Sequence, residues 1–128
     1  NNDHLYSADK FSNSSKMNNE IIKVSSNDKK KDGLLITGLP HDTDYSDESL
    51  SKLINDMQEW QKIRMLGSAA MACCYVASGK AEKYQENGIY IWDIAAGIAI
   101  VESAGGKTEV LNYKDNFQVD IVLSNSKI

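Results

Sequence analysis

The fold is decided by one stretch, residues 89–101, which reads IYIWDIAAGIAIV. It is the longest apolar run of the chain, and a single acid, Asp93, interrupts it. A membrane-spanning helix takes about 20 apolar residues, so this run is too short to cross a bilayer. We expect Ile89–Ile91 to lead into a helix that begins near Asp93 and is stopped by Gly105-Gly106. Because that helix is apolar on nearly every side, it should lie buried between layers.

The segments around this run alternate in type, which predicts an α/β fold. Short apolar runs indicate strands, and Ser46 and Ser68 are placed to accept hydrogen bonds from the free amides at two helix starts. The first of these helices carries an apolar stripe that Trp60 extends, and Asn87-Gly88 predicts a turn. The expected strands are Leu34–Gly38, Lys62–Leu66, Glu82–Glu86, Lys107–Leu111 and Val119–Leu123.

The first 32 residues have a different character. Leu5–Ala8 and Glu20–Ser25 are typical of short strands, and a polar stretch separates them. Two lone strands are marginal in water, so we expect them to pair with a sheet made of other chain. The sequence also begins with Asn1 rather than methionine, so we expect that the chain either has been processed or is part of a longer protein. The two lone strands are a first hint of missing sequence.

Composition narrows the possible functions. The net charge is −4, whereas a nucleic-acid binder normally presents a basic face. The two cysteines, Cys73 and Cys74, are neighbours in a helical run and are poorly placed for a mutual disulfide. Without a disulfide framework or a signal-like segment, a cytoplasmic location is expected. His4 and His41 lack companions at metal-ligand spacing, so no zinc site is predicted.

Asp93 is the first candidate for chemistry. A carboxylate in the first turn of a buried helix is favoured by unpaired amides and by the helix dipole, so it could simply be a helix cap. Ala95, Ala96 and Gly97, however, let the helix start press closely on neighbouring backbone, and Trp92 adds a bulky wall. A rigid carboxylate in that setting also suits a hard cation such as magnesium.

Two further features have a structural and a functional interpretation each. Gly67-Ser68-Ala69-Ala70 could be an ordinary strand-to-helix turn, or could offer its free amides to a ligand. Glu86, beside the expected turn, could be a solvated residue or an acceptor for sugar hydroxyls. The residues alone leave both pairs open.

The order and spacing of these features resemble one family. Residues 92–106 (WDIAAGIAIVESAGG) are similar to the C-terminal signature of inositol monophosphatase-like proteins, in which Trp-Asp precedes small residues, an apolar run and a double glycine. Residues 64–70 (RMLGSAA) resemble the family element Arg-x-x-Gly-(Ser/Thr)-Ala-Ala. The resemblance implies the C-terminal lobe of the layered α/β sugar-phosphatase fold, a mixed sheet with flanking helices. Residues 33–128 would form this lobe, and residues 1–32 would be the end of the N-terminal lobe with two strands left over from its sheet.

The resemblance also implies roles for single residues. Asp93 would be a Mg²⁺ ligand, while Gly67, Ser68 and Ala69 would line the substrate pocket. Glu86 would contact a hydroxyl of an inositol or sugar phosphate, and Arg64 would orient Glu86 from behind. The reaction would be hydrolysis of a phosphate monoester, a small molecule, and family members are often homodimers.

The family's first-half metal motifs, a Glu-Glu pair and an Asp-Pro-(Ile/Leu)-Asp-Gly-Thr loop, are absent from these 128 residues. We therefore expect this chain to lack catalytic residues, to be inactive alone and to need the N-terminal half as its partner. Two alternatives remain open: a 3′(2′),5′-bisphosphate nucleotidase of the same superfamily, and a truncated, non-catalytic lobe.

Overall fold

The computed structural model describes residues 3–9, 11–39 and 43–128. Its centre is a mixed five-stranded sheet in the order β5-β4-β6-β8-β7. The strands β4 and β5 run parallel to each other and β4 runs parallel to β6, whereas β8 is antiparallel to both β6 and β7. Their bounds are β4 Leu34–Thr37, β5 Lys62–Arg64, β6 Lys83–Tyr90, β7 Lys107–Leu111 and β8 Gln118–Ser124.

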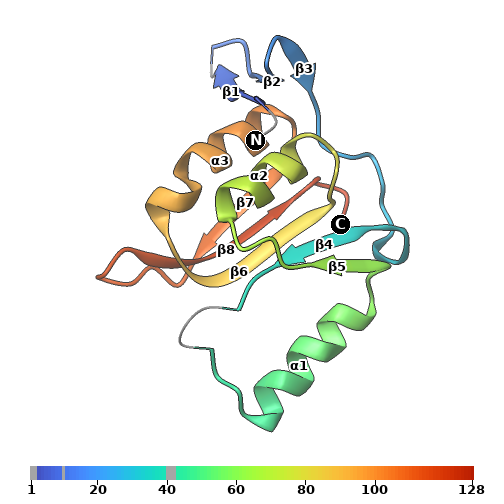
Figure 1. Cartoon of the computed structure of the whole chain (residues 1–128), viewed down its shortest axis with the longest axis vertical. Coiled ribbons are helices and arrows are strands. Elements are labelled where there is room, and N and C mark those ends of the chain that lie inside the picture. Colours follow the sequence, from blue (N-terminus) through green and yellow to red (C-terminus); the bar gives the residue numbers. More distant parts are fainter. Residues whose placement is uncertain (1–2, 10, 40–42) are drawn as a thin grey trace.

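Two helices, α2 (Ala69–Ala77) and α3 (Ile91–Ser103), cover one face of this sheet (Figure 1). They pack on the core residues of β4, β6 and β8. Gly97 of α3 makes the close approach possible, because a Cβ at that position would lie 2.4 Å from the Cβ of Cys73 on α2. The α/β fold expected from the sequence, a mixed sheet with flanking helices, is confirmed, as is the helix that leads to Gly105-Gly106.

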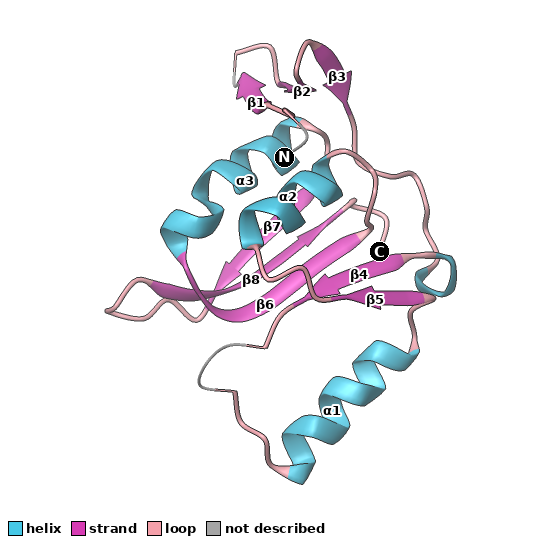
Figure 2. Ribbon diagram, viewed as in Figure 1, coloured by secondary structure: helices cyan, strands magenta, loops and turns pink. Residues whose placement is uncertain are grey.

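The first strands form a sheet of their own on the outer side of α3 (Figure 2). It is antiparallel, in the order β1 (Tyr6–Asp9), β2 (Ser14–Met17) and β3 (Glu20–Ile22). The expectation of two lone strands was therefore wrong. The polar stretch contains β2, whose buried Ser15 donates a hydrogen bond from its Oγ to the carbonyl oxygen of Ile100, 2.6 Å away. Helix α3 thus lies between two sheets, and the division into lobes at residue 32 stays a prediction.

Strand β6 is longer than the sequence suggested. The predicted turn at Asn87-Gly88 is instead a bulge within the strand, since Glu86 pairs with Ile121 while Ile89 pairs with Val119. Two residues of β6 therefore stand opposite one residue of β8, Asp120, as in a β-bulge. The Oδ1 atom of Asp120 accepts a hydrogen bond from the Gly88 amide at 2.9 Å, which satisfies a donor that the bulge leaves unpaired.

Helix α1 (Asp47–Gln58) begins at Ser46, as expected, but it lies apart from the core beyond the β5 edge of the sheet (Figure 1). None of its residues is buried, and Ile54 of the predicted apolar stripe is 51% exposed. Trp60 is buried as predicted, although it follows the helix rather than belonging to it. No helix among the described residues has the length and apolar character needed to span a membrane.

Candidate active site

The three features singled out in the sequence meet in one hollow of about 500 Å³. It lies where α2 begins, where β6 bulges and where α3 begins. Two carboxylates, a helix start and an aromatic ring therefore share one space. The lining residues are Gly67, Ser68, Ala69, Ala70, Glu86, Ile89, Trp92 and Asp93.

Asp93 stands in the first turn of α3 with its side chain exposed. The residue that caps this helix is Tyr90, and no side chain completes the cap. Within the described part of the chain, the Asp93 carboxylate makes no hydrogen bond and no ion pair. The helix dipole still favours a negative charge at this position. The carboxylate is thus held on a rigid element and is available to a ligand.

The start of α2 faces the same hollow. Gly67 has a φ of 65°, a left-handed conformation that glycine adopts easily, and it turns the chain from β5 into the helix. Ser68 then accepts a hydrogen bond on its Oγ from the Met71 amide at 3.4 Å. The amides of Ala69 and Ala70 have no partner within the helix, because the first turn of a helix leaves its donors unpaired. Ser68 therefore caps the helix, and the two amides next to it, which have no partner among the described residues, can donate to a ligand.

Glu86 is held by its neighbours in the strands. The Tyr84 hydroxyl donates a hydrogen bond to Oε2 of Glu86 at 2.8 Å. Gly38, just after β4, lies directly against the Glu86 carboxylate: a Cβ there would be 2.4 Å from the carboxyl carbon. The Arg64 guanidinium instead donates to the Ile63 carbonyl oxygen at 2.8 Å, and within the described residues no hydrogen bond joins it to Glu86. The orienting role of Arg64 stays a prediction. In this structure the side chain that is hydrogen-bonded to Glu86 is Tyr84.

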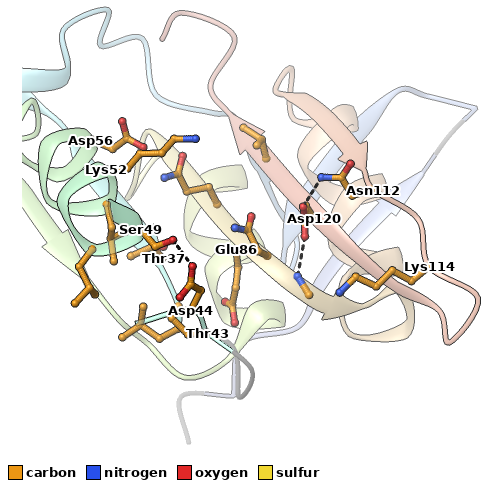
Figure 3. Close-up of a pocket in the computed structure, with 18 residues that line it drawn as sticks. Thr37, Thr43, Asp44, Ser49, Lys52, Asp56, Glu86, Asn112, Lys114 and Asp120 are labelled. Carbon is orange, nitrogen blue, oxygen red and sulfur yellow. Dashed lines mark hydrogen bonds between the residues drawn. The ribbon is translucent and has the colours of Figure 1, made fainter. Parts of the chain in front are cut away.

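A second hollow, of about 690 Å³, lies between α1 and the opposite face of the sheet, and Glu86 also borders it (Figure 3). Most of the residues that line it are polar or charged. The Oδ2 atom of Asp120 accepts a hydrogen bond from the side-chain Nδ2 of Asn112 at 2.6 Å, and Lys52 and Lys114 line the same space. Glu86 therefore stands at the border of two hollows.

The donor set fits a hard cation only in part. Asp93 offers unpaired carboxylate oxygens, the ligand type that Mg²⁺ prefers. Among residues 3–9, 11–39 and 43–128, however, no three His, Cys, Asp or Glu side chains are grouped closely enough to hold a metal ion. His41 and Asp42 lie outside the described residues. The described residues thus supply one ligand rather than a complete site.

Fold and hollow together define a class: a mixed α/β lobe whose polar site residues stand at two helix starts and at a bulged strand. The chain belongs to the inositol monophosphatase family, whose model matches residues 2–127. A sequence relative bears this out. An inositol-1-monophosphatase of Mesorhizobium japonicum is 37% identical over 91 residues, which are 70% of this chain and 34% of that protein.

Solved structures agree with the sequence relatives. The extragenic suppressor protein suhB of Bartonella henselae is 34% identical, with a TM-score of 0.84 over 98% of this chain and 49% of that one. The inositol monophosphatase of Anabaena (Nostoc) sp. PCC 7120 is 29% identical, with a TM-score of 0.82 over 98% of this chain and 51% of that one. The chain therefore spans about half the length of these structures.

Sequence reasoning missed Tyr84 and Gly38. The signal for Tyr84 was its spacing of two residues from Glu86, which places both side chains on one face of a strand. The signal for Gly38 was weaker, because its contact with Glu86 depends on the parallel pairing of β4 with β6. The hollow beside α1 was not predicted either, since it is formed by segments far apart in the sequence.

Proposed function

We propose that this chain is the C-terminal lobe of a magnesium-dependent phosphatase that hydrolyses a phosphate monoester of inositol or a related sugar. One observation carries the proposal: the unpaired carboxylate of Asp93 and the oriented carboxylate of Glu86 border the same hollow as the free amides of α2. The family membership supports phosphatase chemistry, and the contents of the hollow support the division of roles among these residues.

Asp93 would hold the metal ion. Its carboxylate is fixed on α3, is exposed and has no competing partner among the described residues. Magnesium, when bound, supplies positive charge against the phosphoryl oxygens. One carboxylate is too few for such a site, so further ligands would come from the part of the relatives that this chain does not cover. For the same reason we propose that the chain is inactive without that part.

The remaining residues would bind the organic part of the substrate and its phosphate. The Ala69 and Ala70 amides at the start of α2 can donate to an anionic or hydroxylated group, and the helix dipole adds to that attraction. Glu86 can accept hydrogen bonds from hydroxyl groups. An acceptor carboxylate suits a polyol better than a second phosphate, because two negative groups at close range repel each other. This favours an inositol or sugar phosphate over a bisphosphate nucleotide.

A phosphate-release screen tests the proposal. The complete protein that carries these residues would be assayed against inositol, sugar and nucleotide phosphates, each with and without magnesium. We expect release from inositol or sugar phosphates that depends on magnesium. Release from nucleotides alone would favour the nucleotidase alternative, and no release from any ester would contradict the phosphatase proposal.

A further inference from the structure

We propose that Tyr84 and Gly38 are positioning residues that fix the Glu86 carboxylate for the substrate, so that the pair sets the affinity for hydroxylated phosphate esters. The inference rests on the proposed function, because it assigns Glu86 the substrate's hydroxyl groups. It adds two residues that act through Glu86 and do not touch the substrate themselves.

Tyr84 supplies the hydrogen bond. It is 1% exposed and belongs to the core beneath α2 and α3, so its ring cannot swing away. Tyr84 and Glu86 are two residues apart on β6, and side chains at that spacing leave a strand on the same face. The hydroxyl donates to Oε2 of Glu86 at 2.8 Å. Burial, and secondarily the Glu86 carboxylate, raise the pKa of Tyr84, so the hydroxyl keeps its proton and remains a donor.

Gly38 supplies the space. Ile36 pairs with Tyr84 in the parallel ladder, so position 38 stands beside Glu86. A Cβ at Gly38 would lie 2.4 Å from Oε2 and 2.5 Å from Oε1 of Glu86, far inside van der Waals contact. Gly38 does not have a positive φ, so the backbone itself would accept alanine. What glycine provides here is room for the carboxylate.

Together the two contacts leave Glu86 with one oxygen bound and one available. Oε2 accepts from Tyr84, while no described residue donates to Oε1. A long side chain that is already fixed does not have to be ordered when the ligand arrives, so less of the binding energy is lost. Because Glu86 borders both hollows, the same carboxylate is within reach of hydroxyl groups in either of them.

Tyr84→Phe tests the hydrogen bond in the complete protein, because phenylalanine keeps the buried ring. We expect the KM for inositol monophosphate to rise about five-fold, the factor that corresponds to a hydrogen bond of ~1 kcal/mol, with little change in kcat. Para-nitrophenyl phosphate has no hydroxyl group that could donate a hydrogen bond to Glu86, so its KM and kcat should stay unchanged. Tyr75→Phe is the matched control, because Tyr75 lies on α2 away from both hollows.

A merely structural role for Tyr84 would give a different pattern. It would weaken catalysis on both esters alike, and it would do so in a Glu86→Gln background as well. We expect instead that the double variant is no worse than Glu86→Gln alone. Equal losses for the two esters, an unchanged KM in Tyr84→Phe, or additive effects in the double variant would overturn the inference.

Gly38→Ala tests the space. The clash falls on the end of a flexible side chain, so the carboxylate should move while the backbone stays. We expect a rise in KM for inositol monophosphate of at least the size seen for Tyr84→Phe, with an unchanged thermal midpoint. An unchanged KM would contradict the role of Gly38.

A readout that does not need activity separates the two proposals. The ¹³Cζ resonance of Tyr84 reports the hydrogen bond of its hydroxyl, and we expect it to shift in Glu86→Gln but to stay in place in Asp93→Asn. If the wild-type protein hydrolyses no ester, the proposed function fails, and this resonance still tests the contact. If inositol phosphate is hydrolysed but Tyr84→Phe behaves like wild type, only the positioning inference fails.

Discussion

Helices α1 and α3 both begin with acidic residues in the first turn, but they are stabilised in different ways. Helix α1 is capped by the Ser46 side chain and buries none of its residues. Helix α3 has no side-chain cap and is buried through residues that include Gly97 and Val101. Local signals thus account for α1, whereas tertiary packing accounts for α3. The acid of α3 is not needed to start its helix, which leaves Asp93 available to a ligand.

The largest effect on phosphate release should come from replacing the acid in the first turn of α3, compared with the same replacement in α1. In the complete protein, Asp93→Asn should lower magnesium-dependent phosphate release at least about 100-fold, since ligands of a catalytic metal are needed for the chemical step. Asp47→Asn is the matched control, because Asp47 is also an exposed acid in a first helical turn. It should leave turnover within about two-fold of wild type. Wild-type turnover of Asp93→Asn at saturating magnesium would refute the metal role.

The next largest difference between α3 and α1 should appear in the free energy of unfolding, because only α3 is closely packed. Gly97→Ala places a Cβ against Cys73 and should lower the free energy of unfolding by about 1–3 kcal/mol, the usual cost of overpacking a core. Ile54→Ala on the exposed stripe of α1 should change it by less than about 0.5 kcal/mol. Urea titrations of both variants measure the difference. Equal losses would show that α1 is packed as firmly as α3.

The α2–α3 contact should also be sensitive to alkali. Burial raises the pKa of the Cys73 thiol from the ordinary value of 9.0 to about 12. The unfolded chain therefore loses this proton first, and the free energy of unfolding should fall as the pH rises from about 9 to 12. Cys73→Ala should flatten that decline in urea titrations at a series of pH values. An unchanged slope would mean that Cys73 is not the group responsible.

The smallest of these effects should be a loss of amide protection in α1 at low pH. Hydrogen bonds from the Ser49 side chain and from the Ser46 amide and hydroxyl hold the pKa of Asp44 below its ordinary value of 3.8. Their stabilisation is present above that value and is lost as the pH falls through the folded pKa. Amide protection of α1 should therefore weaken below about pH 4 while that of α3 stays constant. Asp44→Asn should remove this dependence, and equal responses of the two helices would contradict it.

Much of the fold could be predicted from the sequence because its signals are local. Ser46 and Ser68 mark helix starts, and Gly105-Gly106 marks a helix end. The missed strand β2 is polar and buries only Ser15, so it has no apolar run that would predict it. Pairing with β1 and β3, together with the hydrogen bond to α3, forms it. Such partners cannot be read from a single segment.

The residues of the candidate site also divide into those with a local signal in the sequence and those that depend on distant partners. Asp93, Ser68 and Glu86 were identified by residue type and spacing, and the structure brings all three to one hollow. Their roles in metal and substrate binding stay predictions. Tyr84 and Gly38 were missed, because what they do depends on how strands pair and not on their own neighbours in the sequence.

The bulge at Asn87-Gly88 decides on which face of the sheet the chain between Glu86 and Asp93 continues. Side chains alternate along a strand, so a regular β6 would place Glu86 and Ile89 on opposite faces. The extra residue shifts the alternation by one, and Ile89 packs against the same core that Tyr84 occupies. Deleting Asn87 would remove the extra residue and leave Glu86 and Ile89 two positions apart, so both would stay on one face. A regular strand that kept Asn87 would instead turn the chain that follows to the other face and carry Asp93 away from Glu86. By absorbing one extra residue, the bulge thus lets Glu86 and Asp93 face the same hollow.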